Sequence, residues 1–205
     1  MNFIQFRERM EVLFCFSTDQ VQLCFPGFHP DNFTRWVKKG LLVRLRNGWY
    51  TFPHLLRQPG AAHYFANRIY RPSYVSLQSA LAFYGAIPEG VVQVTSVTTL
   101  KTSFFVNDSG EYTYRNIKKE LMFGYRPLPF GDGRTILMAT PEKALLDFLY
   151  LYPEYQSAGD MEQLRLDEDF LRSTLKDKVL EDFLSGMGNR ALKKRWLLLR
   201  NSYDL

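Results

Sequence analysis

The chain has 205 residues, of which 46% are hydrophobic and 16% aromatic, a composition that is typical of a globular protein and excludes extensive disorder. The formal net charge is +5, and residues 1–53 carry seven Lys and Arg against four Asp and Glu, so the first quarter holds +3 of the total. This excess is compatible with nucleic-acid contact on one face, and it is far below that of a histone-like protein.

The first elements are predicted to be two helices. Residues 1–14 carry an apolar stripe of helical spacing, made of Phe3, Phe6, Met10, Leu13 and Phe14. Ser17 can then cap a short helix from Thr18 to Cys24, since its hydroxyl can accept a hydrogen bond from the first turn. That helix stops at Pro26-Gly27.

A further helix follows, with one apolar and one polar face. Asp31 can cap it, Phe33, Trp36 and Val37 share one face, and Gly40 ends it as a left-handed residue. The remaining surface is suited to DNA, because Arg can read guanine, Asn can read adenine and Lys neutralises phosphate. The predicted DNA-contacting residues of this helix are Asn32, Thr34, Arg35, Lys38 and Lys39.

A basic hairpin comes next. Residues 41–46 and 49–52 are β-prone runs joined across Asn47-Gly48, a preferred pair for a tight turn. Arg44 and Arg46 are two residues apart, so they are predicted to project from the same strand face. We expect Arg44, Arg46 and Asn47 to hold the DNA backbone or to enter the minor groove.

Helix, turn, helix and basic hairpin in this order predict a winged helix-turn-helix DNA-binding domain over residues 1–53. Winged helices also serve as protein-interaction modules, and a run of Lys and Arg on a helix is often only a solvated face. A pure interaction module therefore stays an alternative. A winged helix reads one half-site, so tight binding would need two copies on the DNA, although no dimer interface is recognisable.

Residues 54–205 are predicted to form a second, mixed α/β domain with a helical C-terminal end, which makes the whole chain α+β. A junction at residues 53–60 contains two prolines and a glycine, and helices are expected at 61–70 and 77–84. Strands are expected at residues 91–97, 103–106, 112–117, 121–125 and 135–138. Thr140 and Pro141 then begin a helix with a buried face of Leu145, Leu146, Leu149 and Tyr150.

At least two more helices follow, with breaks near residues 157–159 and 186–188. The last segment, Asn189 to Arg200, is basic on one side and apolar on the other. It can be a terminal helix that packs on the domain, it can add phosphate contacts, or it can dock a partner, and the sequence leaves these three interpretations open.

No catalytic, metal or cofactor site is predicted. An enzyme hypothesis would use Asp132, Glu142, Lys143 and Asp147, but Glu142-Lys143 lacks the spacing of a Glu-x-Lys metal-nuclease pair, and no phosphate-binding loop or hydrolase motif occurs. The three histidines are scattered, and Cys15 and Cys24 have no zinc spacing, so buried reduced thiols are expected. Without a signal-peptide pattern or a run of about 18 apolar residues, we expect a cytoplasmic protein with no membrane partner.

Four motifs in order resemble the AbiEi family of abortive-infection antitoxins over nearly the whole chain. They lie at residues 36–50 (WVKKGLLVRLRNGWY), at 74–81 (YVSLQSAL) leading to Gly85 and 87–89 (IPE), at 94–98 (VTSVT) and at 139–147 (ATPEKALLD). The resemblance implies the antitoxin and transcriptional autorepressor of a bacterial type IV toxin–antitoxin pair, which binds double-stranded DNA at its own promoter. The functional partner would be a nucleotidyltransferase-like toxin, whose effect the antitoxin counters without necessarily forming a stable complex with it. A stand-alone winged-helix regulator stays an alternative.

Overall fold

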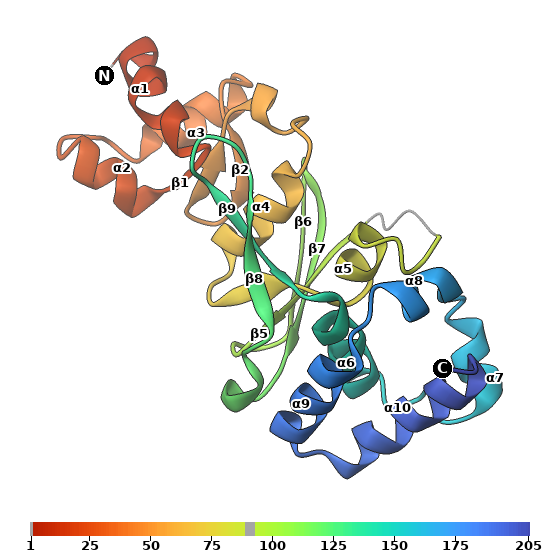
Figure 1. Ribbon diagram of the computed structural model, residues 1–205. Helices are drawn as coiled ribbons and strands as arrows, with labels where there is room; N and C mark the ends of the chain where they lie inside the picture. Colours follow the sequence, from red (N-terminus) through yellow and green to blue (C-terminus); the bar gives the residue numbers. More distant parts are fainter. Residues whose placement is uncertain (1, 89–92) are drawn as a thin grey trace.

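The computed structural model describes residues 2–88 and 93–205, and the fold is α+β. The molecule is elongated, with three short helices and a small sheet at one end, a larger sheet in the middle and a group of helices at the other end (Figure 1). The two termini lie at opposite ends (Figure 1).

The N-terminal end begins with α1 (Phe3–Met10), a 3₁₀ turn (Glu11–Leu13) and β1 (Cys15–Ser17). The prediction of one helix over residues 1–14 was therefore wrong in its last turn, where the left-handed backbone of Phe14 (φ +66°) ends the helical path. The helix α2 (Thr18–Cys24) has the predicted bounds. The Ser17 hydroxyl accepts from the Gln20 N–H, and the Gln20 side chain accepts from the Ser17 N–H, a reciprocal cap.

The helix α3 (Asp31–Lys38) leads into β2 (Val43–Arg46) and β3 (Trp49–Thr51). Asp31 is the first helical residue rather than the cap, because Pro30 before it already has helical backbone angles, and no side chain caps this end. Gly40 has a φ of +67°, as the predicted left-handed end requires. The three strands form an antiparallel sheet in the order β1-β3-β2.

Aromatic side chains fill the space between this small sheet and the three helices. The Phe6 ring lies 4.6 Å from that of Trp36, and the Phe33 ring stacks on Tyr50 at 4.4 Å and 5°. Phe6, Phe16, Phe33, Trp36 and Phe52 are all buried. The predicted apolar faces of α1 and α3 are thus the faces that pack inward.

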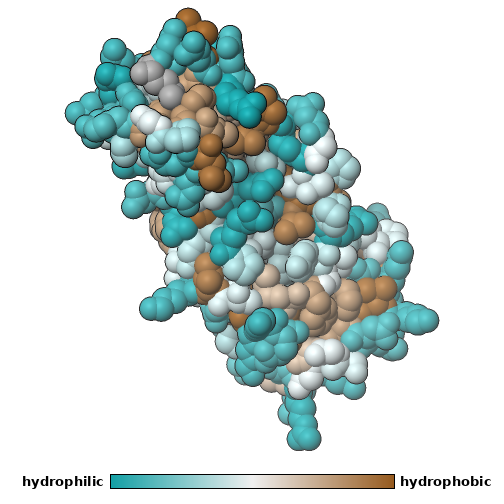
Figure 2. Space-filling model, turned by 90° about the vertical axis from the view of Figure 1, so that its left-hand side faces the viewer, coloured by the Kyte–Doolittle hydropathy of each residue, from teal (hydrophilic) through white to brown (hydrophobic). Residues whose placement is uncertain are grey.

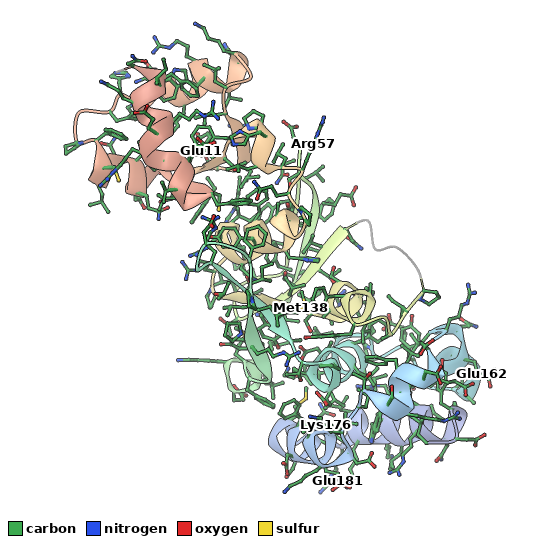
Figure 3. The ribbon with its side chains drawn as sticks, turned by 45° about the horizontal axis from the view of Figure 1, so that its top comes forward. Glu11, Arg57, Met138, Glu162, Lys176 and Glu181 are labelled. Carbon is green, nitrogen blue, oxygen red and sulfur yellow. The ribbon has the colours of Figure 1, made fainter. Side chains whose placement is uncertain are left out.

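The middle of the molecule is a six-stranded mixed sheet in the order β6-β7-β5-β4-β9-β8. Its strands are β4 (Ser73–Val75), β5 (Gln93–Thr98), β6 (Ser103–Asn107), β7 (Gly110–Asn116), β8 (Tyr125–Pro129) and β9 (Thr135–Ala139). The pairs β4–β9 and β5–β7 are parallel, and the other three are antiparallel. Met138, on β9, lies near the centre of the molecule (Figure 3).

One strand prediction differs from this sheet, and one strand was missed. The predicted strand at residues 121–125 is wrong, because Lys119–Leu121 forms a 3₁₀ turn and the strand runs over Tyr125–Pro129. Its two prolines are tolerated because β8 is an edge strand, where a missing N–H can face away from the partner. The central β4 was not predicted, and residues 91 and 92 of the predicted first strand lie outside the described residues.

Helices cover both faces of the large sheet. The helix α4 (Ala61–Ile69) lies on one face, where the Tyr114 hydroxyl donates to the Ala66 carbonyl at 2.9 Å. The helices α5 (Leu77–Phe83) and α6 (Pro141–Leu151) lie on the other (Figure 1). The Thr140 hydroxyl caps α6 by accepting from the Lys143 N–H, as predicted.

The C-terminal end is helical, as predicted, and packs on α6. It consists of α7 (Ala158–Gln163), α8 (Glu168–Ser173), α9 (Asp177–Met187) and α10 (Arg190–Ser202). Lys176 lies at the start of α9 and Glu181 in its first half (Figure 3), and the Lys176 N–H donates to the Glu142 carboxylate at 3.3 Å. In α10, Leu192, Trp196 and Leu199 are buried, so this helix does pack on the domain.

The N-terminal part packs directly against α4 and the segment that follows β8. The Phe14 ring lies 5.4 Å from Tyr64, 5.5 Å from Phe65 and 4.9 Å from Phe130. The boundary between residues 53 and 54 stays a prediction. No helix among the described residues is both long enough and apolar enough to cross a lipid bilayer.

Candidate nucleic-acid interface

The outward face of α3 is polar and open. Thr34, Arg35, Lys38 and Lys39 are exposed and Asn32 is half-buried, while Phe33 and Trp36 anchor the helix to the core from the opposite side. All five predicted DNA-contacting residues of this helix therefore lie outside the buried face. Hydrophilic residues cover much of this end of the molecule, next to separate hydrophobic patches (Figure 2).

Two of these side chains are bonded to each other. The Arg35 guanidinium donates to the Asn32 Oδ1 at 2.5 Å. This bond uses the oxygen of Asn32 and one end of the Arg35 fork, so the two side chains present a joint surface. Arg35 retains further N–H donors for a base edge or a phosphate.

On the hairpin, Arg44 and Asn47 are exposed, as a DNA-contacting role requires. Arg46 differs. Its guanidinium lies 4.8 Å from the ring centroid of Tyr70 and 4.6 Å from that of Phe105, and it donates to the Ile69 carbonyl at 2.6 Å.

Val43 and Leu45 are buried, as the predicted alternation requires, but of the two arginines only Arg44 is open, because Arg46 is half-buried. The register between β2 and β3 shifts at this point. Arg44 pairs with Tyr50, and Arg46, two residues later, pairs with Trp49, which is only one residue away from Tyr50. Such a bulge places an extra residue in one strand and turns the following side chain. Arg46 is consequently directed at the large sheet.

A groove of about 810 Å³ lies between this hairpin and the strand β6. The Asn107 side chain donates to the Leu45 carbonyl at 2.7 Å across one part of it. Arg44 and Asn47 line one wall, and Phe104 and Val106, which are 56% and 65% exposed, line the other. Sequence reasoning missed these two residues, because about 60 positions separate them from the hairpin and their alternation indicates only a strand.

The comparisons with known proteins leave the family open. No family model matches the chain, and no curated protein matches it significantly.

The residues of the enzyme hypothesis do not meet in an open cavity. Asp132 is exposed and pairs with Arg134 at 2.6 Å, whereas Glu142 is buried and accepts from the Lys176 N–H. Lys143 and Asp147 are fully buried and form an ion pair. Among the described residues, no group of three or more His, Cys, Asp or Glu side chains is placed to hold a metal ion.

The ion pair belongs to a buried polar cluster, defined here as Tyr74, Ser76, Lys143 and Asp147. The hydroxyls of Tyr74 and Ser76 each donate to the Asp147 carboxylate at 2.8 Å, and the Lys143 ammonium donates to the Tyr74 oxygen at 3.0 Å. Burial and the nearby Asp147 carboxylate raise the pKa of Tyr74 well above its usual range, so the hydroxyl stays protonated. A Cβ at Gly124 would lie 2.9 Å from the Lys143 side chain, so only glycine leaves room there.

The histidines and cysteines have separate environments. His29 lies 3.3 Å from Asp31, His54 lies 2.5 Å from Glu11, and His63 is packed near the Phe83 ring. Cys15 is buried, as expected, but Cys24 is exposed at the end of α2, so the prediction of two buried thiols was wrong for Cys24. The short α2 turns its last residue to the surface, with Val21 as its buried contact.

Proposed function

We propose that the chain is a transcriptional regulator that binds double-stranded DNA through an N-terminal winged helix-turn-helix. The single observation that supports this most is the open polar face of α3, with Arg35, Lys38 and Lys39 exposed beside the hairpin residues Arg44 and Asn47. The order of three helices and a three-stranded sheet supports the proposed winged helix.

In the proposed complex, α3 enters the major groove and the β2–β3 hairpin follows the adjacent backbone. Arg35 and Asn32 read base edges, and Thr34, Lys38 and Lys39 fix the register through phosphates. Arg44 and Asn47 supply the hairpin contacts. Arg46 holds the hairpin against the large sheet, so its part in DNA binding is indirect.

We further propose that this regulator is the antitoxin of a type IV toxin–antitoxin pair and represses its own promoter, with a nucleotidyltransferase-like toxin as the functional partner. This rests on the AbiEi resemblance. Its motifs are far apart in sequence, yet residues 74–81 and 139–147 contribute all four members of the buried polar cluster, and Thr95, of the third motif, donates to the Ser76 carbonyl at 2.8 Å.

A gel shift with the DNA upstream of the chain's own gene tests the DNA-binding proposal. We expect retardation at low salt that is weakened in an Arg35→Ala variant, with Lys118→Ala, an exposed lysine far from α3 in sequence, as the matched control. Failure to retard this DNA, or an equal effect of both substitutions, would contradict the proposal. Loss of growth rescue from a co-expressed nucleotidyltransferase-like toxin, with DNA binding intact, would refute only the antitoxin part.

The groove beside the hairpin favours a second candidate, a protein-interaction module. Phe104 and Val106 are exposed on the edge strand β6, and apolar edges of this kind are common docking sites. Replacing Phe104 by Ser separates the two functions. If the Phe104→Ser variant still binds DNA but no longer co-purifies with a partner protein, the chain has an interaction role in addition to its role as a regulator.

A further inference from the structure

A second cavity lies far from α3 and is lined by residues from both halves of the chain. Its volume is about 320 Å³, and it opens between α5, α6 and α7. Glu162, which precedes the lining residue Gln163 on α7, marks this helix in Figure 3. Neither the DNA-binding proposal nor the buried polar cluster uses this cavity.

The walls combine apolar side chains with uncharged polar ones. Leu81, Leu145 and Phe148 are buried lining residues, and the Tyr155 ring lies 5.2 Å from Phe148 at an angle of 55°. None of the lining residues that the structure describes carries a charge. A charged ligand would lose its hydration here without gaining an ionic partner, so the cavity favours an uncharged ring compound.

Three glutamines line this uncharged cavity, of which Gln78 and Gln93 are half-buried and Gln163 is exposed. The Oε1 atom of Gln78 is buried and has no hydrogen-bond partner among the described residues. Gln93 accepts from the Thr113 hydroxyl at 2.8 Å through its Oε1, which leaves its amide N–H groups without a described partner. Buried amide groups in folded proteins are normally bonded, and an amide that nothing holds can rotate to present its oxygen to a ligand.

We propose that this cavity binds a small, uncharged heteroaromatic compound that donates a hydrogen bond to Gln78 and accepts one from Gln93. The ring packs between the leucines and the Phe148–Tyr155 pair. A bicyclic ring with an N–H group has the required donor, and a volume near the lower end for ligand pockets limits the compound to about that size. This site is independent of the proposed function.

The test uses the full chain and three probes. Benzimidazole and adenine are uncharged bicyclic rings with both an N–H donor and a ring-nitrogen acceptor, and benzoate is a charged ring of similar size. Ligand-observed NMR and titration calorimetry are expected to show saturable binding of benzimidazole or adenine, one molecule per chain, and no binding of benzoate.

Three variants locate the binding. Gln78→Leu removes the acceptor and is expected to weaken the affinity about fivefold, the effect of one lost hydrogen bond. Ile87→Trp fills the mouth of the cavity from a half-buried position and abolishes binding, and Gln156→Leu, at an exposed position, leaves it unchanged. Circular dichroism melts confirm that each variant folds. Absence of binding for both uncharged probes, or affinities that Gln78→Leu or Ile87→Trp leaves unchanged, would overturn the proposal.

Discussion

The guanidinium of Arg46 lies 4.6 Å from the ring centroid of Phe105 and joins the β2–β3 hairpin to the large sheet. The same group lies over Tyr70 and donates to the Ile69 carbonyl. The hairpin that is proposed to touch DNA is therefore braced by residues that follow Arg46 by 23 to 59 positions.

Replacing Arg46 by Ala should lower the free energy of unfolding by about 1–3 kcal/mol, because a cation–π contact and a charged hydrogen bond are lost together. The exposed neighbour Arg44 is the matched control, and Arg44→Ala should change stability by less than about 0.5 kcal/mol while weakening DNA binding. Urea unfolding followed by circular dichroism measures both. Equal stability of the two variants would mean that the Arg46 contacts do not hold the hairpin.

The buried ion pair should be costly to break from one side. Asp147→Ala leaves the Lys143 ammonium buried without its carboxylate, and we expect a loss of about 3–5 kcal/mol or failure to fold. The double variant Lys143→Met with Asp147→Leu removes both charges and should be the more stable of the two. The exposed pair Arg172–Glu168, whose atoms lie 3.1 Å apart, is also separated by four positions in the sequence and serves as the control. Glu168→Ala should lower the free energy of unfolding by no more than about 0.5 kcal/mol.

The two thiols should react very differently. Burial raises the pKa of Cys15 to about 12, so its thiol stays protonated and inaccessible, whereas Cys24 is exposed. A thiol reagent such as Ellman's reagent should label one cysteine in the native protein and two after unfolding. The Cys24→Ser variant should show no native labelling, and rapid labelling of that variant would contradict the burial of Cys15.

His63 should make the protein less stable in mild acid. Burial lowers its pKa below the usual value, so the unfolded chain binds the proton first as the pH falls. The contribution of neutral His63 to the free energy of unfolding is fully present above a pH of about 6.5, and it is lost as the pH falls through the pKa of His63 in the folded protein. Thermal melts between pH 7.5 and 5 should show a shallower pH dependence for His63→Gln than for the wild type, and no change for the exposed control His29→Gln.

Local chemistry made part of this fold predictable. The reciprocal cap of Ser17 and Gln20 and the Thr140-Pro141 start are complete within four residues, so α2 and the beginning of α6 could be located from the sequence. The central β4 has three residues, too few to show a period of two. Its place depends on pairing with β5 and β9, which no local pattern reports.

In the candidate site, too, local patterns predicted some features, and contacts between distant residues determined others. The helical period separated the buried face of α3 from its polar face, and the structure agrees. The half-buried state of Arg46 depends on a bulge in β2 and on Phe105, 59 positions away, so strand alternation alone could not show that this arginine is engaged. A contact with a distant aromatic residue can override a local sequence pattern, and only the folded structure shows it.

The salt dependence of DNA affinity tests the central claim most directly. Fluorescence anisotropy with labelled upstream DNA, measured at several potassium chloride concentrations, should give an affinity that falls linearly on a double-logarithmic plot. Lys38→Ala should reduce the slope by about one, and Arg35→Ala should weaken binding by about 1–3 kcal/mol and relax preference for the upstream sequence over unrelated DNA. Lys118→Ala should do neither. An affinity that is independent of salt, or slopes that are identical for wild type and Lys38→Ala, would contradict DNA binding through α3.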